Sequence, residues 1–263
     1  MKKALLTYSS FILLFLYIPL VILALYSFND SRINAAWKGF TLHWYVDLFQ
    51  NEAVIDALLN SLLIALVTTA AATVLGTLCA LGLHTYKQRT RTILSGFMYV
   101  PILVPDILMG LSMLLVFSQL HWELGKFTLI IAHITFSISF VVILLSARLA
   151  SMGKTLQEAA SDLGATPWQT FRYVTLPALL PGIISASLLT FTLSIDDFVI
   201  SFFVSGPGST TLPLYIYSMV KRGVTPEINA LSTILVGMIV ILMILSEKFQ
   251  TKGTDGRKGQ LPF

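Results

Sequence analysis

The chain has 263 residues, of which 56% are hydrophobic and only 11% are charged. A soluble domain usually carries about 25% charged residues, so this composition excludes an ordinary soluble domain and favours a membrane protein. The formal charge is +4, but Lys and Arg are scattered in short segments without a basic helix face, so a nucleic-acid partner is not expected. The single cysteine, Cys79, offers neither an intrachain disulfide nor a cysteine metal site, and no metal is expected.

The amino-terminal segment begins with Lys2 and Lys3 and continues as an uncharged run over residues 4–29. A basic start before an apolar run also occurs in signal peptides. This run is too long for the apolar part of a signal peptide and has no small-residue cleavage site near its end. We therefore expect the segment to remain in the protein as a membrane helix.

Six segments are long and apolar enough to cross a bilayer, which takes roughly 20 mostly apolar residues. They are residues 4–28, 57–83, 92–118, 127–147, 179–204 and 228–246. An even number of spans places both termini on one side, and most of the 17 Lys and Arg residues lie in the segments on that side. The positive-inside rule then predicts that both termini are cytoplasmic.

The spans predict an all-α integral membrane protein. We expect an N-terminal helix with an outer connecting segment over 1–56, a transmembrane core over 57–248 with a long cytoplasmic loop at 148–178, and a disordered cytoplasmic tail at 249–263. No convincing internal repeat is visible, which disfavours a secondary transporter built from inverted repeats. The sequence has no GxxxxGKS/T, HExxH or GxSxG motif, so a catalytic role is not expected and any ATP hydrolysis must come from another chain.

Two helix-start signals lie in the 148–178 loop. Both have the spacing of a capping box, in which a Thr and a Glu or Gln three residues later each bond the other's backbone amide. The pairs are Thr155 with Glu158 and Thr166 with Gln169. Pro167 suits the first helical position, and Gly164 can take the left-handed conformation that ends a helix. The loop is therefore predicted to form two short helices joined by a tight turn.

A longer pattern covers the same loop: EAA, a glycine four residues after the last alanine, and a hydrophobic-x-Leu-Pro ending. Its residues are Glu158, Ala159, Ala160, Gly164, Val174, Leu176 and Pro177. The pattern resembles the cytoplasmic coupling loop of ABC importer permeases, with Val174 where that family more often has Ile. The resemblance implies that the short helix docks into a groove of an ATPase subunit and transmits its closure. From the residues alone, Glu158 could simply cap its own helix, and the alanines could be helix formers.

Three acidic residues interrupt apolar segments: Asp106 in the third predicted span, and Asp196 and Asp197 in the fifth. A carboxylate at bilayer depth costs roughly 2.5–3.5 kcal/mol on insertion scales, so it normally faces a wet cavity or a partner. No Lys or Arg lies within a predicted span, although pairing with another subunit or an interfacial position remains open. The rise along straight helices places Asp106 and Asp196 in one layer of the outer half of the bilayer. Such a layer of negative charge suits a cationic substrate. Of the adjacent Asp196 and Asp197, we expect one to line a cavity and the other to bond the backbone.

Two further features bear on this pathway. Pro101 and Pro105 are predicted to kink the third span, because each removes a helix hydrogen bond. Tyr215 and Tyr217, in the outer segment after the fifth span, could stack on an aliphatic cation and are candidate pathway residues. An interfacial aromatic anchor is the alternative explanation for both tyrosines and the one we favour.

Over its whole length the chain resembles spermidine/putrescine importer permeases of the PotC type. The similar segments run from YIPLVILALYSFN and WYVDLF to SIDDFVISFFVSGPGSTTLPLYIYSMVKRGVTPEINALSTI. The resemblance implies a type I ABC importer permease fold (MetI-like) in the bacterial inner membrane. Implied partners are a second permease, two copies of an ATPase that binds ATP and Mg²⁺, and a periplasmic polyamine-binding protein. The resemblance also implies that acidic positions corresponding to Asp106 and Asp196 act in polyamine passage.

Three other interpretations remain open from the sequence. An ABC importer for another solute, such as an iron complex, thiamine or an oxyanion, is one, although the carboxylate layer disfavours an anion. A passive cation channel or carrier would also use intramembrane acids, but it leaves the 148–178 loop unexplained. An intramembrane hydrolase would need the acids to converge as a dyad, and no catalytic signature surrounds them.

Overall fold

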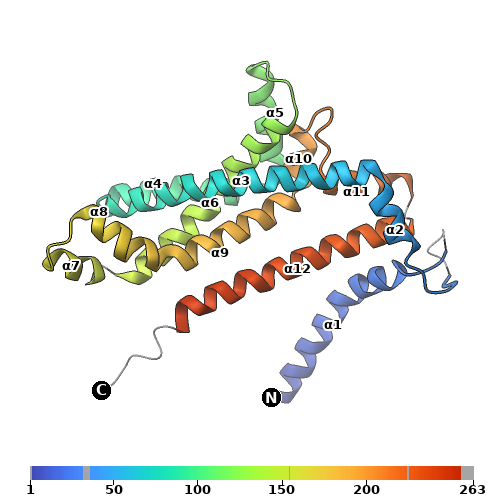
Figure 1. The fold of residues 1–263 in the computed structure, drawn as a ribbon, viewed down its shortest axis with the longest axis horizontal. Coiled ribbons are helices and arrows are strands. Elements are labelled where there is room, and N and C mark those ends of the chain that lie inside the picture. The colour runs from blue at the N-terminus through green and yellow to red at the C-terminus, as the bar shows by residue number, and fades with distance from the viewer. Residues whose placement is uncertain (1, 32–35, 154, 224, 256–263) are drawn as a thin grey trace. The chain divides into compact units, whose positions relative to one another are not determined.

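The computed structural model describes residues 2–31, 36–153, 155–223 and 225–255, and in these residues the regular structure is helical apart from one isolated bridge between Asn29 and Phe40. The α-helices (Figure 1) are α1 (Lys2–Tyr26), α2 (His43–Gln50), α3 (Glu52–Thr85), α4 (Gln88–Leu103), α5 (Asp106–Gln119), α6 (Lys126–Met152), α7 (Thr155–Asp162), α8 (Pro167–Thr170), α9 (Leu176–Ile195), α10 (Val199–Val204), α11 (Leu212–Arg222) and α12 (Pro226–Asp255). A π-helix, η1 (Phe171–Thr175), joins α8 to α9. The all-α prediction is confirmed for this part of the chain.

Four helical segments of the described residues are long and apolar enough to cross a membrane. They are Leu5–Tyr26, Glu52–Thr85, Lys126–Met152 and Pro167–Ile195, and α4 with α5 makes a fifth if this bent pair is one span. The apolar part of α12, predicted as the sixth span, is shorter and covers Pro226–Ile241. α12 itself continues to Asp255, so residues 249–255 of the predicted disordered tail are helical, while 256–263 lie outside the described residues.

The third predicted span is broken between α4 and α5, whose axes differ by 101°. Pro101 lies inside α4, and Pro105 precedes the first residue of α5, where its missing N–H costs no helix bond. The predicted kink is confirmed. The prediction that Asp106 and Asp196 lie in one layer assumed straight helices. Because the third predicted span bends this sharply, the rise along one straight axis does not give the depth of Asp106, and that assumption was wrong.

The fifth predicted span is also broken, which the sequence analysis did not expect. α9 ends at Ile195 and α10 begins at Val199, so Asp196 and Asp197 lie in the connection and not on a continuous helix over 179–204. No Pro or Gly lies in this connection. The directions of the Asp196 and Asp197 side chains are therefore set by the geometry of this connection and not by the spacing of neighbours on one helix.

The described chain divides into two compact units. Unit 1 contains the described residues of Met1–Leu58 and Leu212–Val240, and unit 2 contains those of Leu59–Thr211 and Ile241–Phe263. The core of unit 1 joins α2 and the start of α3 to α11 and α12 through Trp44, Leu48, Val54, Ala57, Leu212, Ala230 and Leu231. The predicted boundaries at residues 56 and 248 mark the limits of the transmembrane core and not a division into compact units, so they stay a prediction.

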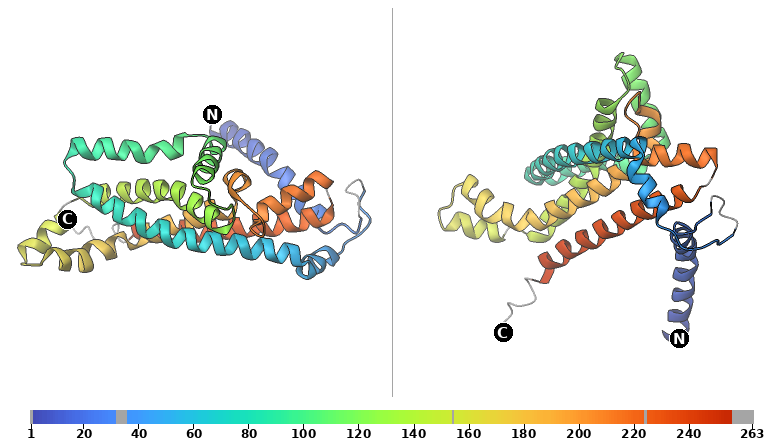
Figure 2. Two further views of the ribbon diagram at one scale, coloured as in Figure 1. Left: turned by 90° about the horizontal axis from the view of Figure 1, so that it is seen from above. Right: turned by 45° about the vertical axis from the view of Figure 1, so that its right-hand side comes forward.

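α6 is the central helix of unit 2. It packs along α9 and also contacts α4, α5 and α10, and α4 and α6 lie side by side in Figures 1 and 2. α6 has buried residues on several sides, including Leu129, Phe136, Val141 and Leu145. A helix buried on several sides must be apolar around most of its circumference, and most buried polar side chains on such a helix hydrogen-bond within the protein.

Gly206, just after α10, lies against the backbone of Leu124, and a Cβ at this glycine would collide with the Leu124 carbonyl group. Gly206→Ala should therefore destabilise the protein by about 1–3 kcal/mol, as expected for overpacking. Gly82 in α3 is the matched control, because a Cβ there meets no atom within 4 Å. Gly82→Ala should be neutral or stabilise by up to ~1 kcal/mol. Thermal unfolding of the detergent-purified protein compares them, and equal midpoints would contradict close packing at Gly206.

Candidate functional site

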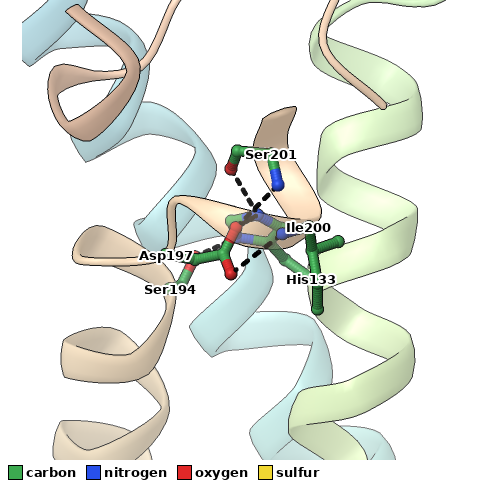
Figure 3. Close-up of polar contacts among 5 residues, drawn as sticks. All are labelled: His133, Ser194, Asp197, Ile200 and Ser201. Carbon is green, nitrogen blue, oxygen red and sulfur yellow. Dashed lines mark hydrogen bonds and ion pairs between the residues drawn. The ribbon is translucent and has the colours of Figure 1, made fainter. Parts of the chain in front are cut away.

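Asp197 lies in the break between α9 and α10, and its side chain is only 10% exposed. Its Oδ2 accepts the backbone N–H of Ser201 at 2.7 Å, and Oδ1 accepts the N–H of Ile200 at 3.4 Å. Oδ2 also lies 3.3 Å from Nε2 of His133 (Figure 3). Asp197 thus bonds the backbone at the start of α10, which is the role predicted for one of the two adjacent aspartates.

His133 is the functional candidate that the sequence analysis missed. Its ring, on α6, is fully buried, with Nδ1 2.8 Å from Oγ of Ser194 and Nε2 3.1 Å from Oγ of Ser201. An ionised carboxylate only accepts hydrogen bonds, so the ring donates to Asp197 in the tautomer that carries its proton on Nε2, and Ser201 lies within reach of the same proton. The expectation of a carboxylate layer without basic partners is wrong for Asp197, because a histidine, like Lys or Arg, can pair with a carboxylate, and His133 lies within reach. The available signal was a histidine in the middle of an apolar span.

Asp196 differs from Asp197 in its exposure and in its hydrogen bonding. It is exposed, and it ends α9 with its backbone N–H donating to the carbonyl oxygen of Thr192 at 3.3 Å. Among the described residues, no hydrogen bond or ion pair reaches its carboxylate from another side chain. The Asp196 carboxylate is therefore available to a group from outside this chain.

Asp106 is exposed in the first turn of α5, directly after the break in the third predicted span. α5 packs against α10, and a Cβ at Gly110 would lie 2.7 Å from the ring of Phe203. The structure thus places Asp106 and the pair Asp196 and Asp197 just before or at the start of two helices that pack on each other in unit 2. No hydrogen bond or ion pair links Asp106 to the pair in the described part of the chain.

Tyr215 and Tyr217 belong to unit 1, on α11. Tyr215 is partly buried and packs against the core of that unit. Tyr217 is 38% exposed, and Nζ of Lys221 lies 4.9 Å from the centre of its ring. The Tyr217 ring therefore already faces an ammonium group, which is the contact proposed for an aliphatic cation, but this ammonium group comes from the same helix.

In the 148–178 loop, α7 is a separate short helix, as predicted. α8 instead continues through η1 into α9, so the second predicted helix is the start of the long helical stretch Pro167–Ile195 and not a separate short helix. Thr166 and Gln169 form the predicted capping box, with the Thr166 N–H donating to Oε1 of Gln169 at 2.8 Å and the Gln169 N–H donating to Oγ1 of Thr166 at 3.4 Å. Gly164 has φ +84°, the left-handed conformation expected after α7. Thr155 is the first residue of α7, and Lys154 before it lies outside the described residues.

The loop exposes both its motif residues and a set of large apolar side chains. Glu158, Ala159, Gly164 and Pro177 are exposed, while Ala160 and Leu176 are partly buried. The exposed apolar side chains are Leu156, Leu163, Trp168 and Tyr173, and Leu163 is 90% exposed. One long-range bond, from Nε2 of Gln157 to Oγ1 of Thr175 at 3.4 Å, ties α7 to η1. Apolar side chains exposed together on a polar loop indicate a surface for a protein partner.

Asp197→Ala should destabilise the protein by about 1–3 kcal/mol, because it leaves the Ser201 N–H and the His133 ring without their buried acceptor. Asp197→Asn retains an oxygen that can accept the backbone N–H and should cost less than Asp197→Ala. Thermal unfolding of the two purified variants and the unsubstituted protein measures the difference. Equal midpoints for all three would show that Asp197 does not hold the break.

The sequence matches the family described as binding-protein-dependent transport system inner membrane component over residues 72–251. The chain is 41% identical to the spermidine/putrescine transport system permease protein PotC of Escherichia coli (strain K12), over 94% of each chain. It is 43% identical to the putrescine transport system permease protein PotI of the same strain, over 87% of this chain and 84% of the relative.

Solved structures agree on the fold. A crystal structure of a bacterial ABC transporter involved in alginate import gives a TM-score of 0.71 at 19% identity, over 97% of this chain and 94% of that chain. An inward-facing structure of the MetNI methionine ABC transporter gives 0.59 at 18% identity, over 77% of this chain and 99% of that chain. The chain has the MetI-like ABC permease fold and belongs to the family of binding-protein-dependent transport system inner membrane components.

Proposed function

We propose that this protein is the permease subunit of an ATP-driven ABC importer that carries polyamines, spermidine or putrescine, across the cytoplasmic membrane. The observation that carries the proposal is the 41% identity to a spermidine/putrescine permease over 94% of both chains. A match of that extent includes the 148–178 loop and both helix breaks. The second relative is a putrescine permease, so the chemistry shared by the relatives is an aliphatic chain with two or more ammonium groups.

The proposed topology has six spans with both termini in the cytoplasm. Four helical segments, the bent pair α4 and α5, and α12 supply the six. The excess of Lys and Arg in the segments on the side of the termini supports the orientation. In this orientation the 148–178 loop is cytoplasmic, and α11 lies on the outside.

The proposed complex contains a second permease, two copies of an ATPase subunit and a periplasmic polyamine-binding protein. The sequence has no phosphate-binding loop, so ATP and Mg²⁺ are assigned to the ATPase subunits. The exposed loop residues Glu158 and Ala159, with the apolar set around Leu163 and Trp168, support docking of the ATPase at this loop. Small side chains at Ala159 and Ala160 permit close approach of the partner helix or groove.

The exposed carboxylates support a substrate pathway formed together with the second permease. Asp106 and Asp196 lie on the surface of the single chain, and a carboxylate facing lipid would cost roughly 2.5–3.5 kcal/mol. A wet cavity between two permeases removes this cost, and the ammonium groups of a polyamine supply the positive charge. We assign Asp197 to holding the break, and we keep Tyr215 and Tyr217 as pathway candidates of lower rank.

Uptake tests the substrate and the role of Asp196 together. Proteoliposomes containing the whole complex should take up radiolabelled spermidine and putrescine when ATP and the binding protein are supplied. Asp196→Asn should lower uptake by at least about tenfold, the loss expected when one charge-assisted contact of roughly 1.5–3 kcal/mol is removed. Asp47→Asn is the control, because Asp47 is an acidic residue of unit 1 outside the proposed pathway, on α2.

The outcomes separate substrate from mechanism. ATP hydrolysis that the binding protein stimulates, without polyamine uptake, would retain the importer and reject the substrate. Equal losses for Asp196→Asn and Asp47→Asn would reject a specific role for the Asp196 charge.

Leu163→Ser tests the docking surface. The Leu163 side chain is 90% exposed, so its removal costs little of this chain's own folding, whereas a docked ATPase would lose a buried apolar contact. Binding-protein-stimulated ATP hydrolysis should fall by about tenfold, as for a residue at the centre of an interface. Leu120→Ser is the matched control, since Leu120 is 52% exposed after α5 and far along the chain from the loop. If both variants hydrolyse ATP equally, the loop is not the docking site.

A further inference from the structure

We propose that His133 is a positioning residue of the transport pathway: it holds Asp197 in the break between α9 and α10 and so sets the Asp196 carboxylate as the group that meets the substrate. This inference rests on the proposed function. It concerns a side chain that no motif of the sequence singled out. His133 itself makes no contact with the substrate in this proposal and acts through the two aspartates.

A single ring ties together the two sides of the break. Nδ1 of His133 contacts Ser194 in the last turn of α9, at 2.8 Å, and Nε2 contacts Ser201 in α10, at 3.1 Å. Between them, Nε2 reaches Oδ2 of Asp197 at 3.3 Å (Figure 3). The ring is fully buried and belongs to α6, the central helix of unit 2. Each side of the break is therefore fixed to the same rigid element.

The bonds leave Asp197 engaged and Asp196 free to act. Asp197 uses both carboxylate oxygens on the N–H groups of Ile200 and Ser201 and one of them on His133. Consecutive Cα atoms are about 3.8 Å apart, so anchoring Asp197 restricts where the exposed side chain of Asp196 can point. Of two adjacent acids with the same chemistry, the one without a partner among the described side chains is the one that an ammonium group can neutralise.

A purely structural role for His133 is the competing explanation. The ring also lies 5.6 Å, centre to centre, from the ring of Phe136 in an edge-to-face arrangement, so it contributes to packing. A packing role would make every polar replacement similarly harmful. A positioning role depends on which ring nitrogen is replaced, because Nε2 alone faces Asp197.

Two conservative variants separate these roles in the reconstituted complex. The amide of Gln at position 133 reaches about as far as Nε2, whereas the amide of Asn reaches about as far as Nδ1 and the Ser194 side. His133→Gln should keep spermidine uptake within about threefold, and His133→Asn should lower it by at least about tenfold, as for loss of a hydrogen bond to a charged group. Ser137→Ala is the matched control, because Ser137 lies one turn further along α6 and its buried hydroxyl has no hydrogen-bond partner among the described residues.

A double-mutant cycle with Asp196→Asn gives the decisive measurement. If His133 acts through Asp196, adding His133→Asn to Asp196→Asn should lower uptake by less than about threefold further. Independent roles predict that the two losses multiply, and that result would overturn the proposal. If the His133→Asn complex does not assemble, His133→Gln decides: an assembled His133→Gln complex that has lost uptake overturns the proposal, and one that retains uptake supports it.

The control measurement distinguishes this inference from the function on which it rests. Uptake by the unsubstituted complex, with multiplying losses in the cycle, would reject the positioning role and leave the importer intact. An unsubstituted complex that assembles and hydrolyses ATP but imports no polyamine would reject the proposed function, and the inference with it.

Discussion

Backbone groups at a helix break that is buried in the protein have no water to bond, and the arrangement of unit 2 around residues 196–198 follows from this constraint. The N–H groups at the start of α10 are satisfied by the Asp197 carboxylate. That carboxylate in turn needs a donor, which His133 supplies from α6. The serines at 194 and 201 complete the ring's hydrogen bonds. A break in an apolar helix thus requires a buried polar cluster, and the cluster fixes the break to the core.

The two broken spans solve the same problem differently. Between α4 and α5 the break lies at a proline, which has no N–H to satisfy, and the chain turns by 101°. Between α9 and α10 no proline is present, and polar side chains satisfy the free backbone N–H groups instead. Both solutions leave an aspartate, Asp106 or Asp196, exposed beside the break. Irregular backbone at membrane depth is tolerated where it borders a cavity. We therefore interpret each break and the exposed aspartate beside it as parts of one feature, the border of the proposed pathway.

The parts of the fold that depend on neighbouring residues were predictable from the sequence. Pro101 and Pro105 predict the bend between α4 and α5. Gly164 predicts the end of α7, and Thr166 predicts the start of α8. Each of these residues acts within a few residues of its own position. The break at 196–198 has no such local signal. Its stabilising partner, His133, is 61 residues from Ser194 and 68 from Ser201 in the sequence. Contacts of that separation follow from packing of α6 against α9 and α10, which apolar composition does not specify.

The continuous helical stretch Pro167–Ile195 connects the two regions on which the proposed function depends. One end is the capped helix of the exposed loop, and the other is the break with Asp196. At 1.5 Å per residue this stretch extends roughly 43 Å, longer than the hydrocarbon core of about 30 Å. A displacement imposed by an ATPase on the loop would therefore reach the break along one helix. α6 packs along the same helix and contacts the break through His133, so the Asp196 carboxylate moves relative to α6 only if this cluster moves or opens. Under the proposed function, the polar cluster that satisfies the break would therefore also couple motion of the loop to substrate contact.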